Sequence, residues 1–251
     1  MQNNHFKIII PFYNIEKWVK NCILSVKLQN YNNFQCILIN DLSEDGSLEI
    51  IKNLVGDDKR FIIIDNKEKK YALKNIYDGI KISKPKKEDI IVTLDGDDWF
   101  FNKNVLENIN QAYSEKKCWI TYGSYVEFPS KNRGKFSKKI SEKIIEQNSF
   151  RESPWTSSHL RSFKYFLWDK IEKKDLLDSN GDFYRMAWDL SFMFPMLEMA
   201  GNKSYFINDI LYVYNLSNPN NDHKIDNQLQ IKTEMQIRKK KKYKRIENDY
   251  M

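Results

Sequence analysis

Residues 6–14 read FKIIIPFYN, a short apolar run that reaches a proline and then becomes more polar. The run Phe6–Ile10 is too short and too rich in isoleucine for a helix, so it predicts a buried strand that enters a turn at Pro11. The following residues, Ile15–Gln29, carry apolar side chains at helical spacing. The chain therefore opens as strand, turn and helix.

The same alternation continues through the first hundred residues. Further strands are predicted at Gln35–Ile39, Phe61–Ile64 and Ile90–Leu94, and further helices at Leu48–Val55 and Tyr71–Ile82. Strands that alternate with helices predict an α/β fold, with a Rossmann-like, mostly parallel sheet flanked by helices. After Phe101 the alternation weakens. A helix at Trp188–Gly201 and a strand pair at Tyr205–Tyr214 indicate a smaller α+β half.

Length and composition limit the classes of protein that fit. A chain of 251 residues fits one main domain. It shows no long apolar span and no signal-peptide pattern at its start, which predicts a cytoplasmic protein. Cys22, Cys36 and Cys118 are odd in number and lack metal-like spacing, so we expect buried, reduced thiols. The formal net charge of +7 owes much to the run RKKKKYKR at residues 238–245.

The segment Leu94–Phe100, LDGDDWF, carries the strongest local signal for chemistry. Three carboxylates within four residues repel one another unless a cation or hydrogen-bond donors compensate them. Oxygen ligands on a short turn suit Mn²⁺ or Mg²⁺. A solvated acidic turn is the alternative, but the position directly after an apolar strand favours a metal site.

Polar residues follow two other predicted strands in the same way. Tyr13 and Asn14 come after the first strand, and Asp41 comes after the second. In parallel sheets ligands bind beyond the carboxyl ends of the strands. We therefore expect these residues and the aspartates from Asp95 to Asp98 to meet at one edge.

The motifs IIIPFYN, ILINDLSEDGS, YALKN and IVTLDGDDW occur in this order along the first hundred residues. Their combination resembles glycosyltransferase family 2, the nucleotide-diphospho-sugar transferases of the GT-A fold. The resemblance implies a GT-A domain at residues 1–224, with a nucleotide-sugar-binding half at 1–104 and an acceptor half at 105–224. A basic helical tail would follow at 225–251.

The resemblance also implies roles for individual residues in the first half. Tyr13 would stack on the nucleotide base, and Asp41 would accept a hydrogen bond from it. Lys74 stands where the family commonly has an arginine near the donor phosphates. Asp95 would lie near the ribose, and Asp97 would ligate the metal. Three neighbouring residues of these motifs complete the expected donor site: Pro11, Asn14 and Gly96.

Roles in the second half are less specific. Asp189, at the start of the helix in MAWDLSFMFPMLEMAG, resembles the family's Glu-Asp motif and is the candidate general base. Trp188 replaces the glutamate, and an aspartate that only favours the helix dipole is the alternative. His223 resembles a metal or diphosphate contact of some GT-A enzymes, or is a surface histidine. Trp188, His159 and Arg161 are candidates for the acceptor side, with packing as the alternative.

The resemblance implies metal-dependent transfer of a sugar, with inversion, from a UDP- or GDP-sugar to a glycan or a lipid-linked glycan. The basic tail is either a solvated helix end or a peripheral contact with the inner face of a membrane, where each Lys or Arg is worth about 1 kcal/mol. A non-catalytic binder of nucleotide sugars or nucleic acid is the rival hypothesis. A sugar nucleotidyltransferase ranks behind it, because PFYNIEKW lacks a glycine-rich loop, and we expect no nucleic-acid partner.

Overall fold

The computed structural model describes residues 3–219 and 226–247. Its strands are β1 (Phe6–Phe12), β2 (Phe34–Asn40), β3 (Phe61–Asp65), β4 (Ile90–Thr93), β5 (Trp99–Phe100), β6 (Ile120–Phe128), β7 (Arg161–Lys164) and β8 (Ser204–Asn215). Its α-helices are α1 (Val19–Lys27), α2 (Ser47–Val55), α3 (Tyr71–Ile82), α4 (Val105–Lys116), α5 (Glu142–Glu146), α6 (Tyr165–Asp169), α7 (Trp188–Ala200) and α9 (Asn227–Arg238). Two 3₁₀ turns, η1 (Lys173–Leu176) and η2 (Gly201–Lys203), flank α7.

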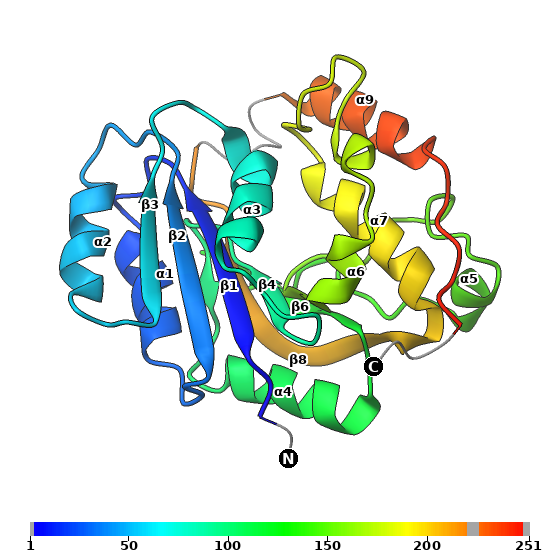
Figure 1. Ribbon diagram of the computed structural model, residues 1–251, viewed down its shortest axis with the longest axis horizontal. Helices are drawn as coiled ribbons and strands as arrows, with labels where there is room; N and C mark the ends of the chain where they lie inside the picture. Colours follow the sequence, from blue (N-terminus) through cyan, green and yellow to red (C-terminus); the bar gives the residue numbers. More distant parts are fainter. Residues whose placement is uncertain (1–2, 220–225, 248–251) are drawn as a thin grey trace.

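The strands form one sheet in the order β3-β2-β1-β4-β7-β6-β8-β5 (Figure 1). In the first half β1 pairs in parallel with β2 and β4, and β2 pairs in parallel with β3. All four strands therefore end at the same edge. The predicted alternation of strands and helices is confirmed, and the helix Tyr71–Ile82 has the predicted bounds.

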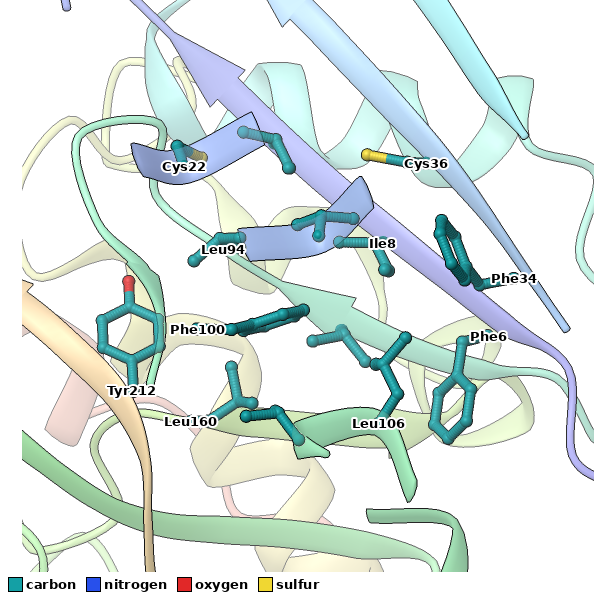
Figure 2. Close-up of a cluster of buried hydrophobic side chains, with 14 of the residues drawn as sticks. Phe6, Ile8, Cys22, Phe34, Cys36, Leu94, Phe100, Leu106, Leu160 and Tyr212 are labelled. Atoms are coloured by element: carbon teal, nitrogen blue, oxygen red, sulfur yellow. The ribbon is translucent and has the colours of Figure 1, made fainter. Parts of the chain in front are cut away.

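The side chains of β1 alternate between two apolar clusters, one on each face of the sheet. Phe6, Ile8 and Ile10 belong to the cluster under α1, α2 and α4, while Ile9 belongs to the cluster under α3, α6 and α7. Figure 2 shows the first cluster. A strand that is buried on both faces is apolar throughout, which explains the continuous run in the sequence.

The second half adds strands to the same sheet. β7 pairs antiparallel with β4 and with β6, and β8 lies parallel to β6 and antiparallel to β5. The prediction of a strand pair at Tyr205–Tyr214 is wrong, because β8 is one strand. Its register against β6 shifts from Ile207 to Ile210, so the two polar residues between them form a bulge instead of a hairpin turn.

The basic C-terminal segment packs against α7 (Figure 1). The backbone N–H of Tyr243 donates to Glu198 Oε2 at 2.9 Å, and the N–H of Ile246 donates to the carbonyl oxygen of Met199 at 3.0 Å. Arg238 donates to two backbone carbonyl oxygens. The tail is therefore anchored at Arg238, Tyr243 and Ile246, while Lys239, Lys241 and Lys244 are exposed. The expectation of a helical tail is wrong for residues 239–247, because α9 ends at Arg238. His223 lies outside the described residues.

Two further expectations concern the cysteines and membrane insertion. Cys22, Cys36 and Cys118 are free thiols and all three are buried, as predicted. Within the part of the chain that the structure describes, every helix is too short or too polar to cross a membrane.

Candidate active site

Three loops at the carboxyl edge of the parallel strands form the candidate site. They follow β1 at Tyr13, β2 at Asp41, and β4 at Asp95 to Asp98. Because β2 and β4 flank β1, their ends are two strand spacings apart, roughly 10 Å. The expectation that separate strands bring polar side chains to one edge is confirmed.

Asp41 lies almost fully buried at the end of β2, where it holds the beginning of α3. Its Oδ1 accepts from the backbone N–H of Lys70 at 2.7 Å and from Asn66 Nδ2 at 3.2 Å, and its Oδ2 accepts from the N–H of Tyr71 at 3.0 Å. Burial acts to raise the pKa of Asp41. The N–H groups of Lys70 and Tyr71, together with the charge of Lys69, help to offset burial, so the pKa is lowered. Asp41 is an anion with fixed donors.

Tyr13 is partly exposed at the end of β1, and a cation covers one face of its ring. The ammonium of Lys69 lies 2.7 Å from the centroid of the Tyr13 ring. Asn14, beside it, has a positive φ of 49° and connects two loops: its N–H donates to Ser43 Oγ at 3.1 Å and its Oδ1 accepts from the N–H of Glu44 at 2.8 Å. Asn14 thus links the loops after β1 and β2 by hydrogen bonds.

The acidic loop approaches β1 so closely that position 96 requires a glycine. A Cβ atom at this position would lie 2.6 Å from Phe12 Cβ and 2.9 Å from the carbonyl oxygen of Pro11. Any larger residue would push the loop away from the strand. Pro11 and Gly96 therefore fix the position of the acidic loop.

Lys74 is separate from these loops. Its ammonium forms an ion pair with Asp78 one turn along α3 and lies 5.7 Å from the centroid of the Phe183 ring. In the described residues the structure does not join Lys74 to Asp41 or to the acidic loop. Lys69 is the lysine that reaches the strand ends.

The last two aspartates of the acidic loop have different surroundings. Asp98 is 1% exposed, and both its oxygens are taken by β8: Oδ2 accepts from Tyr212 Oη at 2.6 Å and Oδ1 from the N–H of Asn215 at 2.7 Å. Burial, followed by the charges of Asp97 and Asp95, raises the pKa of Asp98 well above its usual value. Asp98 therefore fastens the loop to β8.

Asp97 is more accessible than Asp98. Its Oδ2 accepts from Asn218 Nδ2 at 2.7 Å, and burial raises the pKa of its carboxyl.

Tyr212 lies at the margin of the apolar cluster, with its hydroxyl directed away from Leu160 (Figure 2). Besides its bond to Asp98, that hydroxyl lies 3.5 Å from Asp95 Oδ2. Tyr212 thus joins two of the three aspartates.

Arg161 connects the acidic loop to the candidate base. Its side chain is 2% exposed, and its Nη1 donates to Asp189 Oδ2 at 2.6 Å. Its Nη2 lies 3.8 Å from Asp95 Oδ2 and 3.1 Å from His159 Nδ1. Burial raises the pKa of Asp189, and the charge of Arg161 opposes that rise. The first residue of β7 therefore lies between the donor loop and the beginning of α7.

His159 and Trp188 are buried next to Arg161. They are 8% and 7% exposed. The His159 ring stacks on Tyr212 at 4.4 Å between centroids, and the guanidinium of Arg161 lies 5.4 Å from the Trp188 ring. Burial, with the charge of Arg161 as a second cause, holds the pKa of His159 well below its usual value, so the ring is neutral. Packing encloses both rings, which favours the packing alternative for His159 and Trp188.

The oxygen ligands of the acidic loop suit a divalent ion. One group of ligand atoms, from Asp95, Asp98 and His159, lies within 4.8 Å of one another. Both oxygens of Asp98 are already hydrogen-bonded, and His159 Nδ1 faces Arg161. The carboxylates of Asp95 and Asp97, at the more accessible end of the loop, therefore fit a hard cation better.

A cavity of about 400 Å³ lies away from the acidic loop. It is found between α3 and α6 and is lined among others by Tyr77, Tyr165 and Trp168. Its lining includes none of Tyr13, Asp41 and the aspartates of the acidic loop.

Several residues of the site were not predicted from the sequence. Asn66 follows β3 and could have been found by the rule that selected Asp41, namely a polar residue at a strand end. Lys69 carries no local signal beyond its charge. Tyr212 and Asn215 lie on β8, more than a hundred residues after the loop they hold, and no local pattern marks them.

The chain matches the model of a known protein family. The model for "Glycosyl transferase family 2" matches residues 7–177, which contain the strand-end loops. The chain belongs to glycosyl transferase family 2. The predicted family and the class of glycosyltransferase are confirmed at this level.

Relatives in family 2 include two proteins of Streptococcus pneumoniae. Glycosyltransferase GlyA is 24% identical over 216 residues, which cover 83% of this chain and 30% of GlyA. Glycosyltransferase GlyG is 26% identical over 218 residues, which cover 82% of this chain and 69% of GlyG. The chain thus spans less than a third of the first relative and about two thirds of the second.

Solved structures share the fold at low identity. S. aureus TarS in complex with UDP has a TM-score of 0.66 at 16% identity, covering 93% of this chain and 64% of TarS. The mannosyltransferase PcManGT from Pyrobaculum calidifontis, in complex with GDP-Man and Mn²⁺, has a TM-score of 0.60 at 15% identity, covering 87% and 59%. The expected α/β fold of the GT-A type is confirmed.

Proposed function

We propose that this chain transfers a sugar from a nucleoside diphosphate donor to a hydroxyl group of an acceptor, with inversion and with the help of a divalent ion. The observation that carries the proposal is the position of Arg161, whose guanidinium pairs with Asp189 at 2.6 Å and faces Asp95 at 3.8 Å. A candidate base and a candidate donor loop therefore share one buried cation and face the same space.

The donor would lie along the strand ends. Tyr13 offers an aromatic face for the base, and Asp41 offers a carboxylate that is held as an anion. The diphosphate would then extend over the end of β1 toward Asp95 and Asp97. The roughly 10 Å between the ends of β2 and β4 suits a nucleoside diphosphate that spans the two loops.

Asp95 and Asp97 would hold Mn²⁺ or Mg²⁺. When bound, the ion supplies a Lewis acid that offsets the negative charge developing on the leaving diphosphate. Asn218 orients Asp97 by a hydrogen bond of 2.7 Å. The related PcManGT is described with Mn²⁺ and GDP-Man, which supports this assignment.

Asp189 would act as the general base. It lies at the first turn of α7, and the Arg161 guanidinium fixes one of its oxygens. A carboxylate there can take the proton of the acceptor hydroxyl as that oxygen attacks the anomeric carbon. Attack from the side opposite the leaving diphosphate inverts the configuration.

The acceptor would be a glycan or a lipid-linked glycan. Within the basic run, Arg238 and Arg245 bind backbone carbonyl groups. Lys239, Lys241 and Lys244 remain exposed. These exposed lysines are the ones that could meet an anionic membrane surface near such an acceptor. We place the reaction in the cytoplasm.

Hydrolysis of nucleotide sugars tests the proposal. UDP- and GDP-sugars should be hydrolysed slowly by the purified chain with Mn²⁺, and EDTA should stop the reaction. The Asp97→Ala variant should be inactive. Binding of nucleotide sugars without any hydrolysis or transfer, with every donor and with added glycans, would favour the non-catalytic binder instead.

A further inference from the structure

Lys69 makes the two contacts that the nucleotide base is expected to make. Its ammonium lies 2.7 Å from the centroid of the Tyr13 ring. It also pairs with Asp41 Oδ2 at 3.4 Å and donates to the carbonyl oxygen of Asp41 at 3.1 Å. The Lys69 side chain therefore contacts both the Tyr13 ring and the Asp41 carboxylate.

The other donors to Asp41 are fixed. Two are backbone N–H groups at the beginning of α3, from Lys70 and Tyr71. The third is Asn66, which is buried and donates also to Asn75 Oδ1 at 2.7 Å. A carboxylate has about four acceptor positions. Only the position held by Lys69 can be vacated for a base.

Lys69 is able to leave. Its side chain is 30% exposed, compared with 5% for Asp41, so the ammonium can move into water without opening the core. A cation–π contact at an exposed site and a partly exposed ion pair each contribute little stability in water. Such contacts are strong enough to compete with a ligand and weak enough to be displaced.

We propose that the Lys69 ammonium occupies the base subsite of the donor and must be displaced when a nucleotide binds, so that Lys69 lowers the affinity for the donor. This inference rests on the proposed function. A ligand that binds only the state with Lys69 displaced has an apparent affinity reduced by the population of that state. Removing the ammonium should therefore strengthen nucleotide binding.

The sign of the effect distinguishes this role from simple charge attraction. Loss of a lysine near a diphosphate ordinarily weakens binding, because a favourable charge is removed. Displacement of Lys69 predicts that nucleotide binding becomes tighter when the lysine is lost. The test is calorimetric titration of UDP and of GDP, with Mn²⁺, into the wild type, Lys69→Met and Lys67→Met. Lys67 is the matched control, because its side chain is 86% exposed and pairs only with Asp65 among the described residues.

We expect Lys69→Met to bind UDP or GDP about 3- to 30-fold more tightly than the wild type. Lys67→Met should bind as the wild type does or slightly more weakly. Ribose 5-phosphate, which has no base, should bind Lys69→Met no more tightly than the wild type. A thermal melt of each variant verifies that the fold is retained.

Equal or weaker nucleotide binding by Lys69→Met would overturn the inference while leaving the proposed function intact. An equal gain for ribose 5-phosphate would overturn it too, since the effect would not involve the base. If no variant binds any nucleoside diphosphate, the proposed function itself fails and the inference fails with it.

Discussion

The guanidinium of Arg161 lies 2.6 Å from Asp189 Oδ2 and 3.8 Å from Asp95 Oδ2. Arg161 is the first residue of β7, which pairs antiparallel with β4, the strand that leads into the acidic loop. The pairing of these two strands thus places one buried cation between the candidate base and the candidate donor loop.

Asp189→Asn should lose transfer and keep donor binding. An amide cannot accept the proton of the acceptor hydroxyl, so kcat should fall about 100-fold or more. The proposed nucleotide contacts at Tyr13 and Asp41 are not altered, so the Kd for UDP or GDP should be unchanged. Turnover and calorimetry measure the two quantities. Asp57→Asn, on an exposed turn, is the control, and a wild-type rate in Asp189→Asn would exclude the assigned base.

Arg161→Met should move the acid side of the pH profile to higher pH. Burial already raises the pKa of Asp189, and Arg161 opposes that rise. Without the guanidinium the pKa rises further, so the base is protonated, and activity is lost, at a higher pH. The pH profile of kcat/KM measures the direction of this shift.

Arg60→Met is the control for this shift, because it breaks a surface pair with Asp58 away from the strand-end loops. Its profile should match that of the wild type. An unmoved acid side in Arg161→Met would show that the arginine does not set the protonation of the base.

Asp97→Ala should abolish activity, with or without added Mn²⁺, and it should leave the fold intact. Asp97 makes one side-chain hydrogen bond to Asn218, whereas Asp98 fastens the loop to β8. Titration of Mn²⁺ should show weaker binding than in the wild type. Glu44→Ala, an exposed acid on the loop after β2, should bind Mn²⁺ normally. Unchanged Mn²⁺ affinity in Asp97→Ala would move the metal to other ligands.

Tyr212→Phe should destabilise the protein by about 1 to 3 kcal/mol. The hydroxyl is the side-chain donor to Asp98, a carboxyl that is 1% exposed, and its loss leaves Oδ2 without that bond. Urea unfolding measures the free energy. Tyr205→Phe, on the same strand but only partly buried, should change it little. Equal stability of the two variants would mean that Asp98 does not depend on β8.

Glu198→Gln should loosen the C-terminal segment from α7. Glu198 pairs with Arg151 at 2.5 Å and accepts from the N–H of Tyr243, with both charges buried. Breaking a buried pair costs about 3 to 5 kcal/mol. Residues 238–245 should then be cut faster by trypsin in a native-state digest. The control is Glu152→Gln, which breaks an exposed pair with Lys242. Equal digestion rates would refute the anchoring role.

Local patterns predicted the parallel half of the fold closely because each element there is encoded by its own residues. β1 is buried on both faces, so its sequence is continuously apolar, and α3 has the bounds that its periodicity predicts. The second half was harder to predict. A strand pair was predicted at Tyr205–Tyr214, but β8 runs through this range as one strand paired with β6, and a bulge takes up the residues between Ile207 and Ile210.

The candidate site divides in the same way. Asp41 and Asp97 could be selected from the sequence because each follows an apolar strand and the carboxyl ends of parallel strands share an edge. The partners of these residues could not. Lys69 reaches Tyr13 across 56 positions of the chain only because β1 and β3 end at the same edge.

The amino-acid sequence by itself determined where the strands and helices of the parallel half lie, and it placed the acidic residues after the strands, because periodicity and turn chemistry are local properties. Only the tertiary structure decided which side chains share a charge or a hydrogen bond. Arg161 with Asp189, Tyr212 with Asp98, and Lys69 with Tyr13 meet through the order of strands in the sheet. The energies of such contacts depend on burial and distance, which exist only once the chain is packed.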